Sequence, residues 1–110
     1  MNIQIFGKSK SFDTKKAERW FKERRIKFQS VDLIKYGMSR GEFDSVRSAV
    51  GLAALIDEGA KGAEIIKYLA YDEAKAEKLL VDQSLIKAPI VRNGRQATVG
   101  YCPEVWEKWE

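Results

Sequence analysis

The hydrophobic pattern at the start of the chain changes from a two-residue period to a helical one. Apolar and polar side chains alternate over residues 3–6, which predicts a strand, and Gly7 ends that run. After a short loop of serine and lysine, helical spacing begins at Phe12. The apolar face of this predicted helix carries Ala17, Trp20 and Phe21. The chain therefore opens with a strand, a tight loop and a helix.

A second strand and then a helical segment follow. Residues 26–33 begin with the same alternation, so strand, helix and strand make a βαβ unit with parallel strands. Ser39 and Glu42 have the spacing of a capping box, which predicts a helix that ends at Gly51. We expect a helical insert over about residues 39–81, consisting of this helix, a short apolar turn at 52–56, and helical stretches at 63–68 and 72–80.

The last third of the chain returns to strands. The Asn93-Gly94 pair predicts a type I′ hairpin turn, so residues 89–91 and 97–100 should pair antiparallel. Pro103 suits the first position of a final helix, on which we expect one of Trp106 and Trp109 to be packed and the other exposed.

Taken together, the predicted elements follow the order β-α-β, helical insert, β-β-α within one domain spanning residues 1–110. This order is the thioredoxin-like layout, an α/β fold with a four-stranded mixed sheet and helices on both faces. Pro89 stands at the start of the third strand, where that fold has a cis-proline.

Composition narrows the chemistry that the chain can perform. It has 110 residues, one cysteine (Cys102) and no histidine, so an internal disulfide is impossible and a zinc or haem site is not expected. There is no apolar run of the ~18 residues that a membrane span needs, and no signal peptide is visible, so we expect a cytoplasmic protein.

Positive charge is concentrated in the first part of the chain. Residues 1–40 hold 11 Lys/Arg and 4 Asp/Glu, whereas residues 41–110 hold 9 and 12. The first helix should begin at the carboxyl end of the first strand, where free backbone N–H groups and the helix dipole favour anions or a thiolate, and Ser11 falls at that point. The charge is either that of a solvated helix or an attraction for an anionic ligand or partner.

Two segments resemble the arsenate reductase (ArsC) family, which includes glutathione-linked arsenate reductases and the Spx transcription regulators. The first is residues 7–20, GKSKSFDTKKAERW. The second is residues 85–94, LIKAPIVRNG, with the valine-glycine-tyrosine return at 99–101. The resemblance covers nearly the whole chain and implies the thioredoxin-like fold with a redox or regulatory role.

The sequence differs from the family at the positions that carry the family's catalytic and anion-binding residues. Counting back from Ala17, the family's nucleophilic cysteine falls on Ser11, and the second cysteine of Spx-type proteins falls on Thr14. The arginine before the cis-proline is replaced by Ala88, and a further oxyanion-binding arginine is missing near Cys102. Arsenate is attacked by a thiolate, which a serine hydroxyl cannot replace, and no histidine is present to act as a base for Ser11.

The resemblance assigns Ser11 to the catalytic position, natural or engineered. It places an anion or thiol substrate against seven further residues: Lys8, Lys10, Phe12, Asp13, Thr14, Ala88 and Pro89. Each also has a structural explanation, since Ser11 can cap the helix and Lys8 and Lys10 can be solvated loop residues. Cys102 precedes a helix start, where the pKa of a thiol can be lowered, or it is a half-buried or surface cysteine without a role.

Two functions follow from these expectations. The first is an ArsC-like thiol oxidoreductase, inactive as given, with no bound cofactor, glutathione as a possible co-substrate and a small oxyanion as ligand. The second is a non-catalytic regulatory module that binds a protein partner, as Spx-type proteins bind RNA polymerase. Direct nucleic-acid binding is not expected, because no recognised motif or aromatic stripe accompanies the +4 charge. We expect a monomer.

Overall fold

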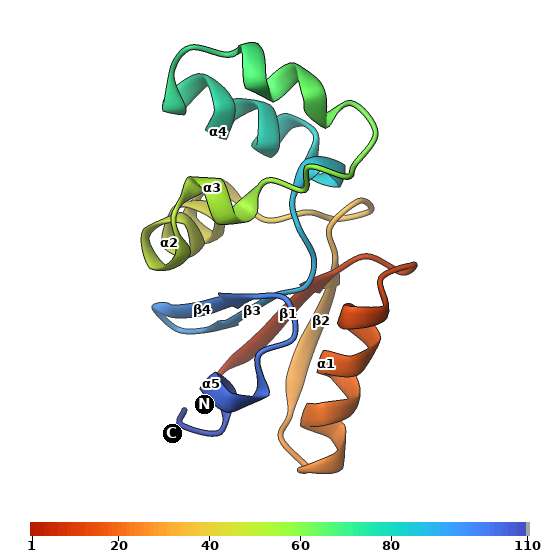
Figure 1. Ribbon diagram of the computed structural model, residues 1–110. Helices are drawn as coiled ribbons and strands as arrows, with labels where there is room; N and C mark the ends of the chain where they lie inside the picture. The colour runs from red at the N-terminus through yellow and green to blue at the C-terminus, as the bar shows by residue number, and fades with distance from the viewer. Residues whose placement is uncertain (110) are drawn as a thin grey trace.

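The computed structural model describes residues 1–109 and shows one four-stranded sheet between two groups of helices (Figure 1). The strand order is β2-β1-β3-β4, with β1 and β2 parallel and the other neighbours antiparallel. The strands are β1 (Ile3–Gly7), β2 (Phe28–Asp32), β3 (Ile90–Asn93) and β4 (Gln96–Val99). The α/β layout predicted from the sequence is therefore confirmed.

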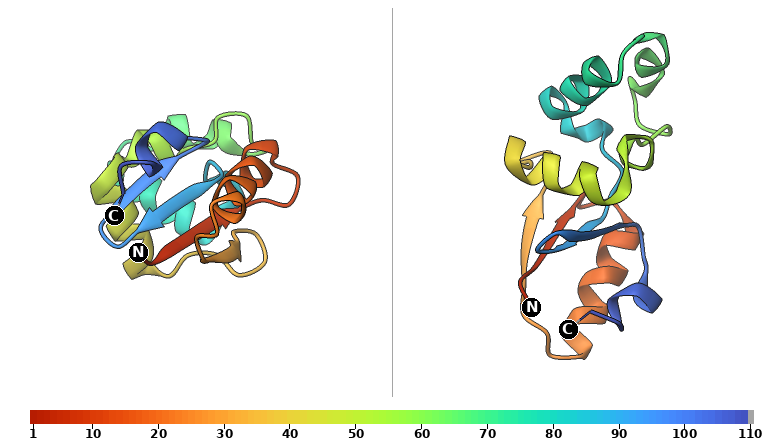
Figure 2. Two further views of the ribbon diagram at one scale, coloured as in Figure 1. Left: turned by 90° about the horizontal axis from the view of Figure 1, so that it is seen from below. Right: turned by 90° about the vertical axis from the view of Figure 1, so that its left-hand side faces the viewer.

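The helices are divided between the two faces of the sheet. One face carries the first and last helices, α1 (Phe12–Glu23) and α5 (Pro103–Trp106). Beyond the other face lies the helical insert, which extends away from the sheet (Figure 2). The insert consists of α2 (Arg40–Val50), α3 (Leu52–Leu55), the 3₁₀ helix η1 (Ala63–Tyr68), α4 (Asp72–Val81) and the short 3₁₀ helix η2 (Gln83–Leu85).

Two hydrophobic cores correspond to the two faces. Under α1 and α5 the core is mainly aromatic, and Trp20 and Phe21 of α1 contact Trp106 of α5 edge-on or tilted, with ring centroids 5.4 and 5.1 Å away. On the insert side, Phe6 and Ile90 of the sheet pack against the apolar faces of the insert helices. The insert therefore completes one of the two cores.

Several local predictions are confirmed by side-chain geometry. Ser39 and Glu42 form a capping box, in which the Ser39 hydroxyl accepts the Glu42 N–H at 3.1 Å and the Glu42 carboxylate accepts the Ser39 N–H at 2.9 Å. Gly51 ends α2 with a positive φ of 86°. The Ala88-Pro89 peptide bond is cis, as the resemblance to the ArsC family implied.

Three local predictions are wrong. The hairpin turn is centred on Gly94-Arg95, since Asn93 pairs with Gln96, and only Gly94 has a positive φ, which is the type II′ rather than the type I′ pattern. Trp106 and Trp109 are both buried, because the C-terminal segment folds back under the sheet. The apolar segment after Gly51 forms the short helix α3 rather than only a turn.

Helix α1 ends in a Schellman motif with an arginine at its left-handed position. The Arg25 N–H donates to Lys22 O and the Ile26 N–H donates to Phe21 O, each at 3.0 Å, which is the Schellman motif that ends many helices. Arg25 occupies the left-handed position of that motif, with a φ of 58°, where glycine is the usual residue. Ile26 packs against the core that contains Phe21.

Candidate functional site

The sheet register brings three separate segments to one end of the sheet. Phe6, at the carboxyl end of β1, lies opposite Ile90 of β3, and Ile90 lies opposite Val99 of β4. The β1–α1 loop, the segment before β3 and the segment after β4 therefore meet at that end. A backbone hydrogen bond of 2.8 Å from Gly100 N–H to Pro89 O joins the last two.

Ser11 is the N-cap residue of α1. Its hydroxyl accepts the backbone N–H of Thr14 at 3.1 Å, and its carbonyl accepts the N–H of Lys15. Within residues 1–109, the N–H groups of Phe12 and Asp13 have no hydrogen-bond acceptor, so the first turn of α1 presents two free donors. The capping role expected for Ser11 is confirmed, and it leaves the helix terminus open to an anion.

Thr14 fixes the loop against α1. It is buried, and its hydroxyl accepts the backbone N–H of Lys8 at 3.3 Å. Gly7 packs directly on the Thr14 side chain, so closely that a Cβ on Gly7 would overlap the Thr14 methyl group. Thr14 therefore shapes the base of the loop from inside the fold, whereas Phe12 and Asp13 are exposed beside it.

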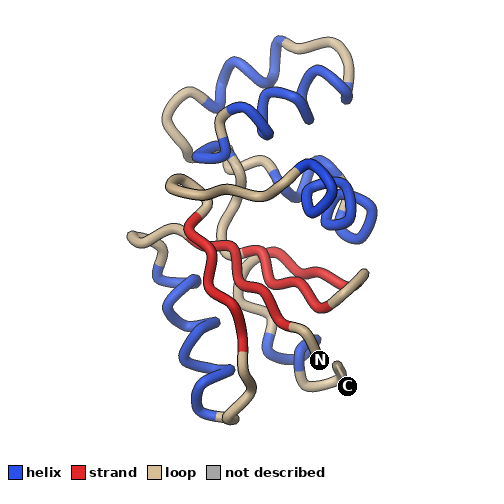
Figure 3. The backbone as a smooth tube through the Cα atoms, turned by 180° about the vertical axis from the view of Figure 1, so that it is seen from behind, coloured by secondary structure: helices blue, strands red, loops and turns tan. Residues whose placement is uncertain are grey.

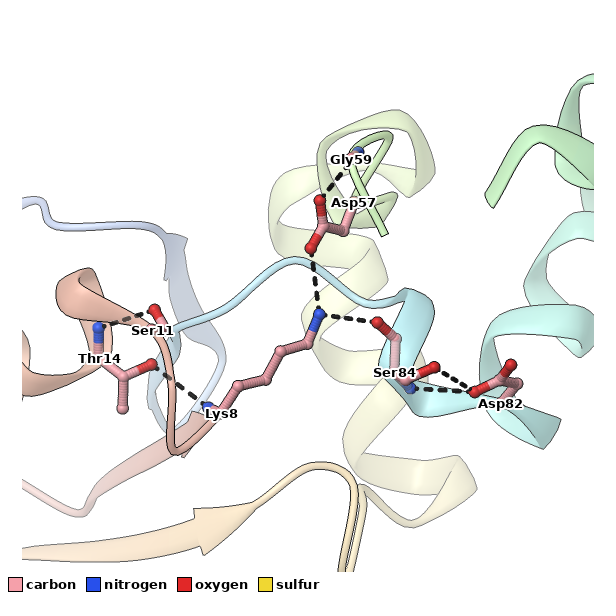
Figure 4. Close-up of polar contacts among 7 residues, drawn as sticks. All are labelled: Lys8, Ser11, Thr14, Asp57, Gly59, Asp82 and Ser84. Atoms are coloured by element: carbon pink, nitrogen blue, oxygen red, sulfur yellow. Dashed lines mark hydrogen bonds and ion pairs between the residues drawn. The ribbon is translucent and has the colours of Figure 1, made fainter. Parts of the chain in front are cut away.

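The ammonium group of Lys8 lies in a contact that the sequence did not predict (Figure 4). It donates to the Asp57 carboxylate at 3.1 Å and to the Ser84 carbonyl at 2.7 Å. The Lys8 side chain is only 16% exposed. Asp57 also accepts the Gly59 N–H at 3.1 Å. Lys8 thus ties the loop to the insert at two points, the segment after α3 and the helix η2. Lys10 is exposed and has no partner within residues 1–109.

The β1–α1 loop with the start of α1 is the first wall of the site, and Ala88 and Pro89, before β3, form the second. Pro89 is buried and Ala88 is half-buried. Within the part of the chain that the structure describes, neither the N–H nor the carbonyl of Ala88 makes a hydrogen bond, although those of the flanking segments do. These two groups are available to an extended ligand, and no side-chain cation accompanies them at position 88.

The segment after β4 forms the third wall, and its cysteine is not activated. The Cys102 thiol is half-buried and donates to Val99 O at 3.3 Å. Burial raises its pKa, the carboxylates of Glu104 and Asp13 add to that effect, and a hydrogen bond with Thr98 opposes it. The expectation that the following helix lowers this pKa is therefore wrong. Since α5 has only four residues, its dipole is too small to outweigh burial.

Lys16 and Tyr101, two exposed residues near the third wall, form a contact that the sequence did not predict. The ammonium of Lys16 lies 5.7 Å from the ring centroid of Tyr101, so a cation–π contact connects α1 to the β4–α5 segment. Tyr101 in turn packs edge-on against Trp106, with ring centroids 5.6 Å apart. Periodicity relates only residues within one helix or strand, so it could not predict a contact between Lys16 and Tyr101, which belong to different segments.

Only part of the predicted site lines the hollow beside the loop. A hollow of about 220 Å³ lies between the loop, α1 and the end of β2, and its walls include Gly7, Lys8 and Thr14. Ser11, Ala88 and Pro89 are not among its walls. Among residues 1–109, no cluster of three acidic, histidine or cysteine side chains could hold a metal ion, and no helix could cross a membrane.

Comparison with known proteins identifies the fold. No protein-family model matches the chain, and no curated protein matches it in sequence. Among solved structures, an ArsC-family-related protein from Bacteroides fragilis has 20% identity and a TM-score of 0.85 over 98% of both chains. An arsenate reductase from Vibrio cholerae has 20% identity and a TM-score of 0.82, covering 96% of this chain and 94% of that one.

A third structure agrees with these two. An arsenate reductase (ArsC) related protein from Brucella melitensis has 22% identity and a TM-score of 0.66, covering 99% of this chain and 94% of that one. Together these likenesses show that the chain has the thioredoxin-like fold of the ArsC proteins along its whole length.

Proposed function

We propose that this chain is an ArsC-like protein that binds a small oxyanion or glutathione at the β1–α1 loop without carrying out thiol chemistry. The observation that carries the proposal is the geometry of Ser11. It caps α1 at the point where two free N–H groups face outward, and its side chain is a hydroxyl instead of a thiol. The site can therefore hold an anion but cannot form a thiol–arsenate adduct or a disulfide with glutathione.

Glutathione fits the walls of the site. It is an extended peptide with carboxylates at its ends, and extended peptides bind by pairing with free backbone groups. The unpaired N–H and carbonyl of Ala88 supply such groups, while exposed Lys10 and the α1 terminus favour a carboxylate. Lys8 would contribute only through its backbone, because its ammonium group is already paired with Asp57.

Two measurements test this function. Arsenate reduction with glutathione and glutaredoxin should stay at the buffer rate for the chain as given and for a Cys102→Ala variant. Titration with sulfate or glutathione should shift the backbone amide NMR signals of residues 8–15 and of Ala88. Turnover that survives in Cys102→Ala would show that the reaction does not need a thiol, and shifts confined to other residues would place the ligand elsewhere.

A second candidate is the regulatory function, in which the protein binds RNA polymerase as Spx-type proteins do. The observation that favours it is the exposed basic surface of α1, which carries Lys15, Lys16, Arg19 and Lys22. In this case purified RNA polymerase should retain the protein on a column, and charge reversal at Arg19 should abolish retention. Retention unchanged by this reversal would exclude α1 as the contact surface. For either function we propose a cytoplasmic monomer.

A further inference from the structure

The edge of the sheet formed by β2 is unpaired on its outer side. β2 is the first strand in the order β2-β1-β3-β4, and β1 is its only strand partner among residues 1–109. The Leu33 N–H donates to Gly7 O at 2.9 Å, and hydrogen bonds alternate along a parallel pair. The N–H and carbonyl groups of Phe28, Ser30 and Asp32 therefore point away from β1, on the outer side of the sheet. The Asp32 carbonyl accepts the N–H groups of Tyr36 and Gly37, so the free groups of this edge are those of Phe28 and Ser30 and the Asp32 N–H. Figure 3 shows β2 as the outermost strand.

A hollow with an apolar floor and a cationic rim lies at the start of this edge. It measures about 500 Å³, and its floor is formed by Ile26 and Phe28, both partly buried. Its rim is formed by three exposed cations, Lys22, Arg25 and Lys27. Among the residues described, none of the three rim cations has an acidic partner within salt-bridge distance. The positive charge at this end of β2 is therefore not neutralised within the fold.

The conformation of Arg25 suggests that its side chain is selected for something other than stability. A non-glycine residue in the left-handed region costs of order 1 kcal/mol, and at this Schellman position glycine would carry no such cost. The Arg25 side chain makes no hydrogen bond or ion pair among residues 1–109 that would offset the cost. Backbone strain that is not compensated locally is typical of functional positions.

We propose that the β2 edge is a docking site for an extended acidic segment of another protein. The segment adds a strand to β2 through the outward backbone groups of Phe28 and Ser30. It places an apolar side chain in the hollow over Ile26 and Phe28, and its carboxylates lie against Lys22, Arg25 and Lys27. The acidic part of the segment lies at the start of β2, because Asp32 makes the other end less favourable to anions.

A second copy of this chain fits the same edge less well. If two β2 strands paired antiparallel about a two-fold axis, each copy would bring three rim cations to the interface. The nearby anions of the other copy would be only two, Asp32 and Glu18, whose carboxylate accepts the Ser30 hydroxyl at 2.6 Å. Uncompensated charge of this kind on an edge strand opposes pairing between copies. The unpaired cations therefore favour an acidic partner.

The probe for this site is a short synthetic peptide in which glutamate and valine alternate, blocked at both ends. A control peptide has glutamine in place of each glutamate, and another has the same composition with scattered prolines, which cannot join a strand ladder. Binding is followed by backbone amide NMR shifts and by hydrogen exchange of the Phe28, Ser30 and Asp32 amides. We expect the acidic peptide alone to shift residues 22–32 and to protect those three amides.

Arg25→Gly is the decisive variant, because it separates binding from folding. We expect it to raise the melting temperature, since the left-handed strain is removed, and to weaken peptide binding by about two- to five-fold, the effect of one exposed ion pair. Lys27→Gln should weaken binding similarly. Lys61→Gln removes an exposed cation from the insert and should leave binding unchanged.

Several outcomes would overturn the proposal. These are equal binding of the glutamine or proline peptide, shifts confined to residues 8–15, and unchanged affinity in Arg25→Gly. Protection of the β2 amides that depends on protein concentration without peptide would assign the edge to a second copy instead. Since residues 8–15 and residues 22–32 are observed separately, failure here is distinguishable from failure of the anion site at Ser11.

Discussion

Replacing Ser11 by cysteine tests whether the terminus of α1 acts on the side chain at this position. The Ser11 hydroxyl accepts the Thr14 N–H at 3.1 Å, and a thiolate placed there would accept the same donor. The terminus of a helix stabilises an exposed anion by about 0.3–1 kcal/mol. A hydrogen bond to a charged acceptor contributes about 1.5–3 kcal/mol, roughly half of it beyond what a neutral thiol would gain.

Together these contributions predict how far the pKa of the Ser11→Cys thiol is lowered. One pH unit corresponds to about 1.4 kcal/mol, so the Ser11→Cys thiol should titrate about one to two units below the value of about 8.5 for a free cysteine. Neighbouring charges change this little. Lys8 is paired with Asp57, Asp13 in the first turn opposes the thiolate, and Lys10 is exposed and screened by salt.

The pKa is measured as the pH dependence of the rate of alkylation by iodoacetamide, in a Cys102→Ala background. Ser9→Cys is the matched control, since Ser9 is exposed in the same loop but caps no helix. We expect a midpoint near 8.5 for Ser9→Cys and a clearly lower one for Ser11→Cys, with little change at high salt. Equal midpoints in the two variants would refute the capping geometry and the assignment of the family's nucleophile to position 11.

Three further results are expected. Lys8→Met should lower the free energy of unfolding by about 1–3 kcal/mol in urea titrations, because it leaves Asp57 without its partner in a partly buried site; a loss equal to that of an exposed lysine would contradict this. Gly7→Ala should cost about 1–3 kcal/mol by overlap with Thr14, and adding Thr14→Ala should recover part of the loss in a double-mutant cycle. At pH 8.5, Cys102 should react with iodoacetamide more slowly in the native protein than in urea, since burial raises its pKa; equal rates would exclude that effect.

The order of the elements could be predicted because each depends on neighbouring residues. Alternation placed β1, the capping box of Ser39 and Glu42 placed α2, and Pro103 placed the start of α5. The hairpin was predicted one residue too early, because Asn93-Gly94 and Gly94-Arg95 share the same glycine and differ only in register. Register depends on which side chains the sheet buries, which a dipeptide does not specify.

The backbone features of the candidate site could be predicted from the sequence, but the contacts that its side chains make with distant residues could not. Ser11 as a helix cap follows from its place before the first helix, and Pro89 as a cis-proline follows from the resemblance to the ArsC family. The contacts of Lys8 do not, because Asp57 and Ser84 are 49 and 76 residues away. Nor could the sequence reveal the left-handed Arg25, since only the Schellman hydrogen bonds at the end of α1 show that a glycine position holds an arginine.

The backbone pairing between residues 55–57 and 85–87, within the insert, has a consequence for how the protein opens. Ile56 and Ile86 form a β-bridge, and reciprocal backbone bonds of 2.8 Å join Asp57 to Leu85 and Lys87 to Leu55. Residues 57–85 thus form a loop whose two ends are hydrogen-bonded to each other, so the loop opens only when these bonds break together. Under native conditions residues 57–85 should therefore exchange their amide hydrogens as one cooperative unit, ahead of the sheet. Lys8 joins that unit to the loop, so each opening also releases the loop that carries Ser11.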